Sequence, residues 1–178
     1  MNSRELFYLF IRYLIIVLVG LFGINLIYTV FTPLTIYPSL WILKLFYNLN
    51  MENNTLILGR YSINIISACI AGAAYYLLLI LNLSTPMKTK TRVNSLVFSV
   101  IFFLAFNIIR LVIFASLFFA GYSYFDLAHK AVWYLGSTIF VVALWFLNVS
   151  LFKIKSVPAY TDLKNLFGNI RYKRKRKK

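Results

Sequence analysis

The amino-acid sequence predicts an all-α fold: a polytopic membrane helix bundle with about four transmembrane helices plus interfacial helices. Two observations carry this prediction. Hydrophobic residues make up 61% of the 178 residues and charged residues only 13%, whereas soluble domains average about 45–50% and about 25%. The apolar residues also gather into segments of about 20 residues, the length that crosses the hydrocarbon core of a bilayer. A soluble fold of this length cannot bury so much apolar surface, so lipid must be its solvent.

Four apolar segments are long enough to span a membrane. The first, Leu6–Phe31, is too long for the apolar core of a cleaved signal peptide, and bulky side chains stand where a cleavage site needs small ones. The other spans are expected at about Ile63–Leu83, Val93–Phe118 and Lys130–Phe152. The length of the chain allows one compact domain.

A shorter apolar stretch, Ile36–Tyr47, is interrupted by Pro38 and Lys44. It is too short to cross a bilayer, so we expect it to lie at the interface or to re-enter the membrane. Counting it as a span gives five spans, which is the alternative topology. The segment that follows contains Asn53-Asn54-Thr55, a weak match to an N-glycosylation acceptor.

Basic residues set the expected orientation. On the four-span topology, most of the 19 lysines and arginines fall on one side of the membrane: before or early in the first span, at Lys88, Lys90 and Arg92, and after Phe152. The positive-inside rule places that side in the cytoplasm. We therefore expect a multi-pass protein of the cell membrane with both termini cytoplasmic and with loops 32–62 and 119–129 outside. A five-span topology would put many positive charges on the wrong side.

The C-terminal part of the chain, 156–178, is expected to follow an integral membrane domain at 1–155. Apolar residues recur at helical spacing within Ser156–Ile170, which is typical of an amphipathic helix on a membrane surface. The last eight residues then carry seven positive charges. Such a run can indicate nucleic acid binding, but next to a membrane domain attraction to anionic lipid explains it. We expect a lipid surface as a partner and no nucleic acid.

Ionisable residues within the spans are candidates for function, because a charge in lipid is costly. Arg110 lies in the third span between apolar neighbours, about 12 Å below the outer end at about 1.5 Å per residue. Asn107 precedes it by one helical turn and shares its face. An arginine in this place can also snorkel or bind carbonyl oxygens within the bundle, which would make its role structural.

Cys69 and His129 are the only cysteine and the only histidine. Cys69 lies among small residues near the outer end of the second span, where an inert thiol and close helix packing are the ordinary explanation. His129 stands where the outer loop enters the fourth span, and Asp126 is three residues earlier, where it can orient the imidazole if the segment is helical. An interfacial histidine can also have no chemical task.

Taken together, Cys69, Arg110 and His129 indicate a function that none of them indicates alone. On the charge-derived topology, Cys69, Arg110 and His129 fall on three different spans and in the outer half of the membrane. A cysteine nucleophile needs a thiolate, which a nearby cation or imidazole stabilises. Histidine can pass a proton to a leaving amine, and a fixed arginine can stabilise an oxyanion. The set predicts acyl transfer without a metal or another cofactor.

The order Cys, Arg, His across successive spans resembles the exosortase/archaeosortase family of integral membrane enzymes. The matching pieces are Ala68-Cys69-Ile70-Ala71-Gly72, Asn107-Ile-Ile-Arg110 and His129. The small size looks most like the compact archaeal members called pacearchaeosortases. The resemblance covers roughly Thr55 to Phe152. Ile70 departs from the pattern, since many relatives have a serine or threonine after the cysteine.

The resemblance implies an intramembrane cysteine protease-transpeptidase, with 1–155 as its catalytic domain. Family members recognise membrane-anchored surface proteins by a C-terminal sorting signal, which is a short motif, a transmembrane helix and a basic cluster. They cleave near the motif on the outer side and transfer the new C-terminus to an acceptor, often a membrane lipid. Cys69 would be the nucleophile that forms a thioester, His129 the general acid/base, and Arg110 the group that stabilises the oxyanion or thiolate. Asn107 and Asp126 are supporting residues suggested by spacing alone.

Two functions from other classes stay open. The chain can be a non-catalytic membrane subunit of an assembly or export complex, with Arg110 paired to another protein. It can also be a lipid-modifying enzyme that uses the same outer-leaflet pocket, in which case activity would not depend on Cys69.

Overall fold

The computed structural model describes residues 3–154. Within this part of the chain, four helical segments are long and apolar enough to cross a membrane: Gly23–Lys44, Ser67–Ser84, Thr89–Phe119 and Phe125–Leu151. The prediction of an all-α membrane helix bundle is confirmed, and the count is four spans. The amphipathic helix and basic tail predicted for 156–178 lie outside the described residues.

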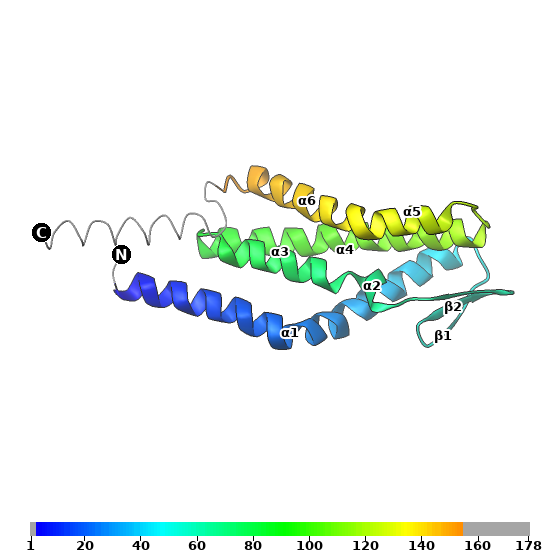
Figure 1. Ribbon diagram of the computed structural model, residues 1–178, viewed down its shortest axis with the longest axis horizontal. Helices are drawn as coiled ribbons and strands as arrows, with labels where there is room; N and C mark the ends of the chain where they lie inside the picture. Colours follow the sequence, from blue (N-terminus) through cyan, green and yellow to red (C-terminus); the bar gives the residue numbers. More distant parts are fainter. Residues whose placement is uncertain (1–2, 155–178) are drawn as a thin grey trace, which may run out of the picture.

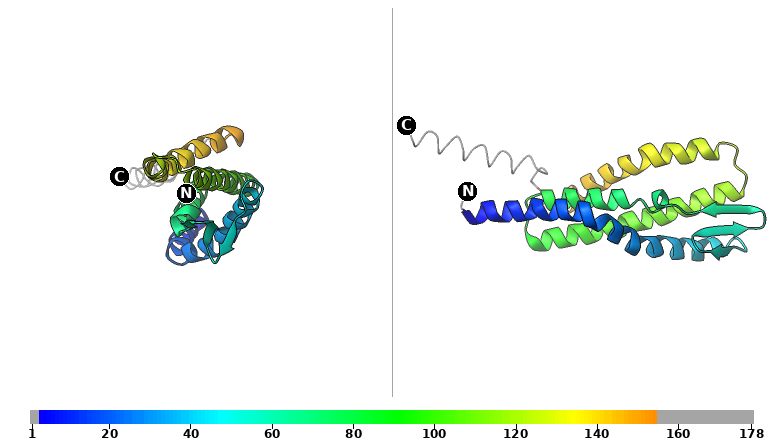
Figure 2. Two further views of the ribbon diagram at one scale, coloured as in Figure 1. Left: turned by 90° about the vertical axis from the view of Figure 1, so that its right-hand side faces the viewer. Right: turned by 60° about the horizontal axis from the view of Figure 1, so that its bottom comes forward.

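The long helices run alongside one another, as Figure 1 shows. Helices α3 (Gly72–Ser84) and α4 (Thr89–Phe119) form the centre, with α1 (Ser3–Lys44) packed on both of them and α6 (Ser137–Leu151) packed on both as well. The end-on view in Figure 2 shows α1 and α6 on opposite sides of α4. The N-terminus, the α3–α4 connection and the end of α6 lie at one end of the bundle.

Helix α1 is a single helix of 42 residues with Pro33 and Pro38 inside it. The prediction that the first helix ends at Phe31 and that Ile36–Tyr47 forms a separate interfacial piece is therefore wrong, because one helix contains Leu6–Phe31 and continues to Lys44. At about 1.5 Å per residue the helix is about 63 Å long, twice the hydrocarbon core. Among its described residues, Gly23–Lys44 is long and apolar enough to cross a membrane, and Phe7–Leu21 is a shorter apolar stretch of the same helix.

Packing explains why the helix passes through two prolines. A proline in a helix removes one hydrogen bond and strains the preceding turn, which bends rather than ends a helix when the surroundings hold it. The residues beyond Pro33 are held by the core at this end of the bundle, where Ile36, Leu40 and Leu43 are buried against Leu111 and Ala115 of α4. Figure 1 shows that α1 changes direction along its length.

A three-stranded antiparallel sheet follows α1, in the segment predicted as an outer loop. Its strands, in the order β1-β2-β3, are Asn50–Glu52, Thr55–Leu58 and Tyr61–Asn64. Two-residue turns join them, and Asn53 and Gly59 adopt positive φ there, which short hairpin turns require. The sheet lies at the end of the bundle opposite the N-terminus.

The second span begins later than predicted and is broken once. Ile63, the predicted start, belongs to β3, and the helix begins at Ser67. The first piece, α2 (Ser67–Ile70), ends because Ala71 adopts φ +58, a left-handed conformation that costs energy for a residue with a Cβ. The predicted start at Lys130 of the last span is also too late, because helix α5 (Phe125–Ala131) already begins at Phe125 and continues through a π-helical segment, η1 (Val132–Gly136), into α6.

Gly72 permits the close approach of α1 and α3. A Cβ at this position would lie 2.6 Å from Cζ and 2.7 Å from Cε1 of Tyr28, too close unless the ring moves. We therefore expect Gly72→Ala to lower the free energy of unfolding by about 1–3 kcal/mol, the usual cost of overpacking a core. Thermal unfolding in detergent measures the loss. Removing the ring in the same chain, as in Gly72→Ala/Tyr28→Ala, should recover part of it, since the two changes meet in one contact. Strict additivity of the two losses would contradict this explanation.

Candidate active site

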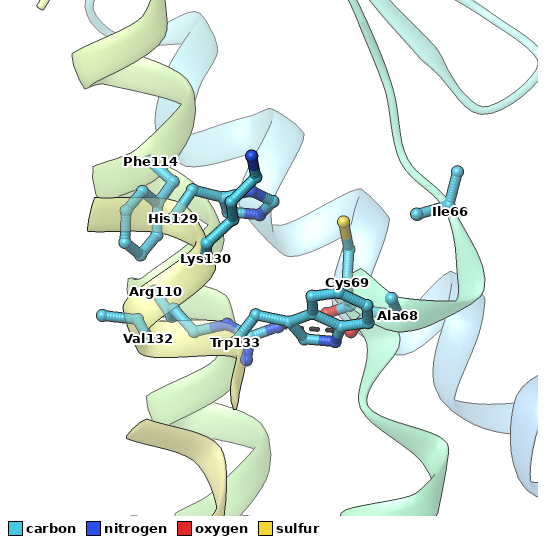
Figure 3. A pocket seen from close by; sticks show the side chains of 9 residues that line it. All are labelled: Ile66, Ala68, Cys69, Arg110, Phe114, His129, Lys130, Val132 and Trp133. Atoms are coloured by element: carbon cyan, nitrogen blue, oxygen red, sulfur yellow. Dashed lines mark hydrogen bonds between the residues drawn. The ribbon is translucent and has the colours of Figure 1, made fainter. Parts of the chain in front are cut away.

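Cys69, Arg110 and His129 come from α2, α4 and α5 and line the same space. Two adjoining cavities, of about 170 Å³ and about 250 Å³, are each bordered by all three side chains and by Ile66 and Phe114. Figure 3 shows the three side chains around the smaller cavity. The structure thus brings together three residues that lie 41 and 19 positions apart along the chain.

Cys69 stands in the last turn before the break in the second span. Its thiol is free and its side chain is half-buried. Two neighbours in the chain, Ile65 and Ile70, are buried in the core and fix the turn in place. The backbone N–H of Cys69 donates to the carbonyl oxygen of Ile66 at 2.9 Å. The cysteine is therefore presented on a short, firmly packed turn rather than inside a regular helix.

Two side chains of α4 bind the carbonyl oxygens that the break leaves without helical donors. A helix that stops leaves the last carbonyl groups unpaired. Asn107 donates from Nδ2 to the oxygens of Cys69 at 3.0 Å and Ile70 at 3.2 Å. Arg110 donates from Nη2 to the oxygens of Cys69 at 3.1 Å and Ala68 at 3.5 Å. Asn107 and Arg110, which the sequence predicted to share one face of the helix, thus together hold the backbone of Cys69.

Arg110 also joins α2 to α6. Its Nη1 donates to Oγ of Ser137 at 2.8 Å. The guanidinium therefore bridges a carbonyl oxygen on one helix and a hydroxyl on another, in the fixed fork geometry that only arginine offers. Figure 3 shows the guanidinium on the backbone side of Cys69, with the sulfur directed away from it toward the level of His129.

Ser137 is a site residue that the sequence did not reveal. A serine in a span costs little, so nothing distinguished it from other small residues. Its position depends on η1: eight residues separate it from His129, and at about 100° per residue an α-helix would turn the two about 80° apart. A π-turn takes up an extra residue, which brings the two residues back to nearly the same face.

His129 is packed between aromatic rings. Its imidazole lies 5.5 Å from the ring centroid of Phe125, stacked on it, and 5.3 Å from that of Phe114, edge-on. Arg110 and Asp126 both lie near enough to act on it electrostatically. Asp126 itself is exposed in the first turn of α5, and within residues 3–154 no hydrogen bond joins its carboxylate to the imidazole. The phenylalanine rings, rather than Asp126, fix the plane of the imidazole.

The arrangement is suited to acyl transfer. A thiol, an imidazole and a guanidinium border one small cavity whose other walls are largely apolar, including Ile66, Val132 and Trp133. A nucleophile, a proton carrier and a cation in one place are the groups that the chemistry needs. Largely apolar walls strengthen the mutual electrostatic effects of these groups.

Comparison with family models, with curated proteins and with solved structures gives no match for the chain. The chemistry of the site is therefore inferred from its own residues.

Proposed function

We propose that this protein is an intramembrane cysteine protease-transpeptidase of the exosortase/archaeosortase type. The observation that carries the proposal is the meeting of Cys69, Arg110 and His129, from three helices, at one cavity. If the arginine only snorkelled, the cysteine only packed and the histidine only lay at the interface, the three side chains would have no reason to line the same cavity. A shared catalytic task would require them to do so.

In the proposed reaction, the Cys69 thiol gives its proton to His129, and the sulfur attacks the carbonyl carbon of the scissile peptide bond. The tetrahedral intermediate collapses, the C–N bond breaks, and His129 gives a proton to the leaving amine. The N-terminal part of the substrate stays attached as a thioester. A hydroxyl or amine of an acceptor then attacks the thioester and releases the thiol. Bound substrate and the largely apolar walls of the cavity would together exclude water from the thioester, which would favour transfer over hydrolysis.

The proposed substrates are surface proteins held in the membrane by a C-terminal sorting signal, and a membrane lipid is the proposed acceptor. In this proposal both termini are cytoplasmic and the site lies in the outer half of the membrane. Support comes from the charges: Lys88 and Lys90 lie at the start of α4 and Lys153 just after the end of α6. These two element ends lie at one end of the bundle, whereas α2 and α5 lie toward the other. The positive-inside rule then turns the cavity outward.

The test is chemical labelling of Cys69, the only thiol in the chain. A membrane-impermeant maleimide applied to the outer face of intact cells should label it. Arg110 donates to the carbonyl oxygens of Cys69 and Ala68 and so holds the turn that presents the thiol to the cavity. Replacing Arg110 by glutamine should therefore slow labelling by about tenfold, the effect of about 1.4 kcal/mol.

The control is Ser123→Ala, a change in the exposed turn before α5 that lines neither cavity of the site. It should label at the wild-type rate. A Cys69 that stays unlabelled in folded wild-type protein, or that is labelled only from the cytoplasmic face, would reject the proposal.

A further inference from the structure

Strand β3 has a free edge that leads directly to the cysteine. Among residues 3–154, β3 pairs with β2 on one side and ends the sheet on the other. The chain then passes through Ile65 and Ile66 into α2, where Cys69 lies. A strand edge presents a row of N–H and C=O groups that can pair with another extended chain.

The hydrogen-bonding pattern shows which residues of β3 are available. Backbone groups of an antiparallel strand point alternately toward and away from its partner. Ile65 donates from its N–H to the carbonyl oxygen of Asn54 at 2.9 Å, so the odd-numbered residues Tyr61, Ile63 and Ile65 face β2. Ser62 and Asn64 therefore direct their N–H and C=O groups away from the sheet, and both residues are exposed.

The free edge borders the larger cavity of the site. That cavity, of about 250 Å³, is lined by the segment Ser62–Ile66 together with Cys69, Arg110 and His129. Three aromatic side chains of the neighbouring helices, Phe114, Phe118 and Phe125, form another part of its wall. A strand edge, a nucleophile and an apolar wall thus surround one space.

We propose that β3 binds the substrate by β-strand addition: an extended segment of the sorting signal pairs with the backbone of Ser62 and Asn64, and its carbonyl group is thereby placed at Cys69. This inference rests on the proposed function. Main-chain hydrogen bonds would supply affinity, and alternate side chains of the bound segment would meet the phenylalanine wall. The substrate class is accordingly an extended, unstructured peptide with free amide N–H groups at alternate positions and apolar residues on one face.

The probe is acetyl-Ala-Ala-Ala-chloromethyl ketone, whose recognition depends on its main chain alone. The Cys69 sulfur displaces chloride and forms a thioether, which intact-mass spectrometry follows over time in the purified full-length protein. We expect alkylation to be faster than with chloroacetamide, which has the same reactive group without a peptide. N-methylation of the amide that pairs with β3 should slow alkylation by about two- to twelvefold, since one hydrogen bond is worth about 0.5–1.5 kcal/mol. N-methylation of the adjacent amide, which points the other way, should change the rate little.

Two variants of β3 test the same hydrogen bonds from the side of the protein. Ser62→Pro and Asn64→Pro each remove one outward N–H and leave the bonds to β2 in place, as an edge strand tolerates. Both should reduce the advantage of the peptide over chloroacetamide, measured as the ratio of the two alkylation rates within the same variant. Equal rates for the two N-methylated peptides in wild-type protein would overturn the docking inference alone, and this test needs no variant. A Cys69 inert to all of these reagents would overturn the proposed function as well.

Discussion

Cys69→Ala is expected to abolish the processing of surface proteins while the protein still folds and reaches the membrane. The thiol is half-buried and free, so its loss removes little packing, whereas a thioester cannot form without sulfur. Cys69→Ser should also be inactive to within detection, because a serine hydroxyl needs a stronger base than the site supplies. His129→Gln should lower processing by about 10²–10⁴-fold, the usual contribution of a general acid/base.

Mass spectrometry of surface proteins measures whether their C-terminal ends have been processed. The cells used carry one variant each, as their only copy of this protein. Amounts of the protein variants are compared by immunoblot. Ser67→Ala is the matched control, since Ser67 is exposed on the same short helix and lines neither cavity of the site. Unchanged processing in Cys69→Ala cells would favour a lipid-modifying enzyme or a non-catalytic subunit, in which the cysteine is a packing residue.

The sequence predicted the membrane class and the number of spans because these depend on composition and segment length. It also singled out the site residues by rarity: one cysteine, one histidine and one arginine flanked by apolar residues. The topology derived from the basic residues, together with the position of each residue in its span, was enough to suggest that the three lie at similar depth in the membrane. Asn107 was placed correctly on the face of Arg110, because a helical turn of three residues needs no tertiary information.

The missed features depend on tertiary contacts. Hydropathy could not show that α1 continues beyond Pro33, because the helix there is held by packing against α4. The sheet was missed because its strands are only three and four residues long and sit in a segment with no clear alternation. The left-handed Ala71 and the π-turn of η1 have no sequence signature at all, yet these two irregularities free the carbonyl groups that Arg110 binds and align Ser137 with His129.

Arg110→Lys is expected to lose most of the activity although the positive charge is kept. The guanidinium binds the Cys69 carbonyl oxygen and the Ser137 hydroxyl at once, and a single ammonium cannot reproduce that fork. Each hydrogen bond left unmade in a buried place costs about 1–3 kcal/mol. We therefore expect the alkylation of Cys69 by chloroacetamide to slow by about tenfold or more, with processing of surface proteins reduced at least as much.

Ser137→Ala separates the two roles of the guanidinium. It leaves the charge and the bonds to α2 intact but removes the anchor on α6, so Arg110 should hold the cysteine less firmly and alkylation should slow by a smaller factor. Thr138→Ala, one residue further and exposed, should change nothing. Thermal unfolding in detergent supplies the second readout. If Arg110 only caps the broken helix, Arg110→Lys will lower the unfolding temperature while Cys69 of the folded protein reacts at the wild-type rate. A slower reaction at a nearly unchanged unfolding temperature is the result that ties the arginine to the chemistry of the thiol.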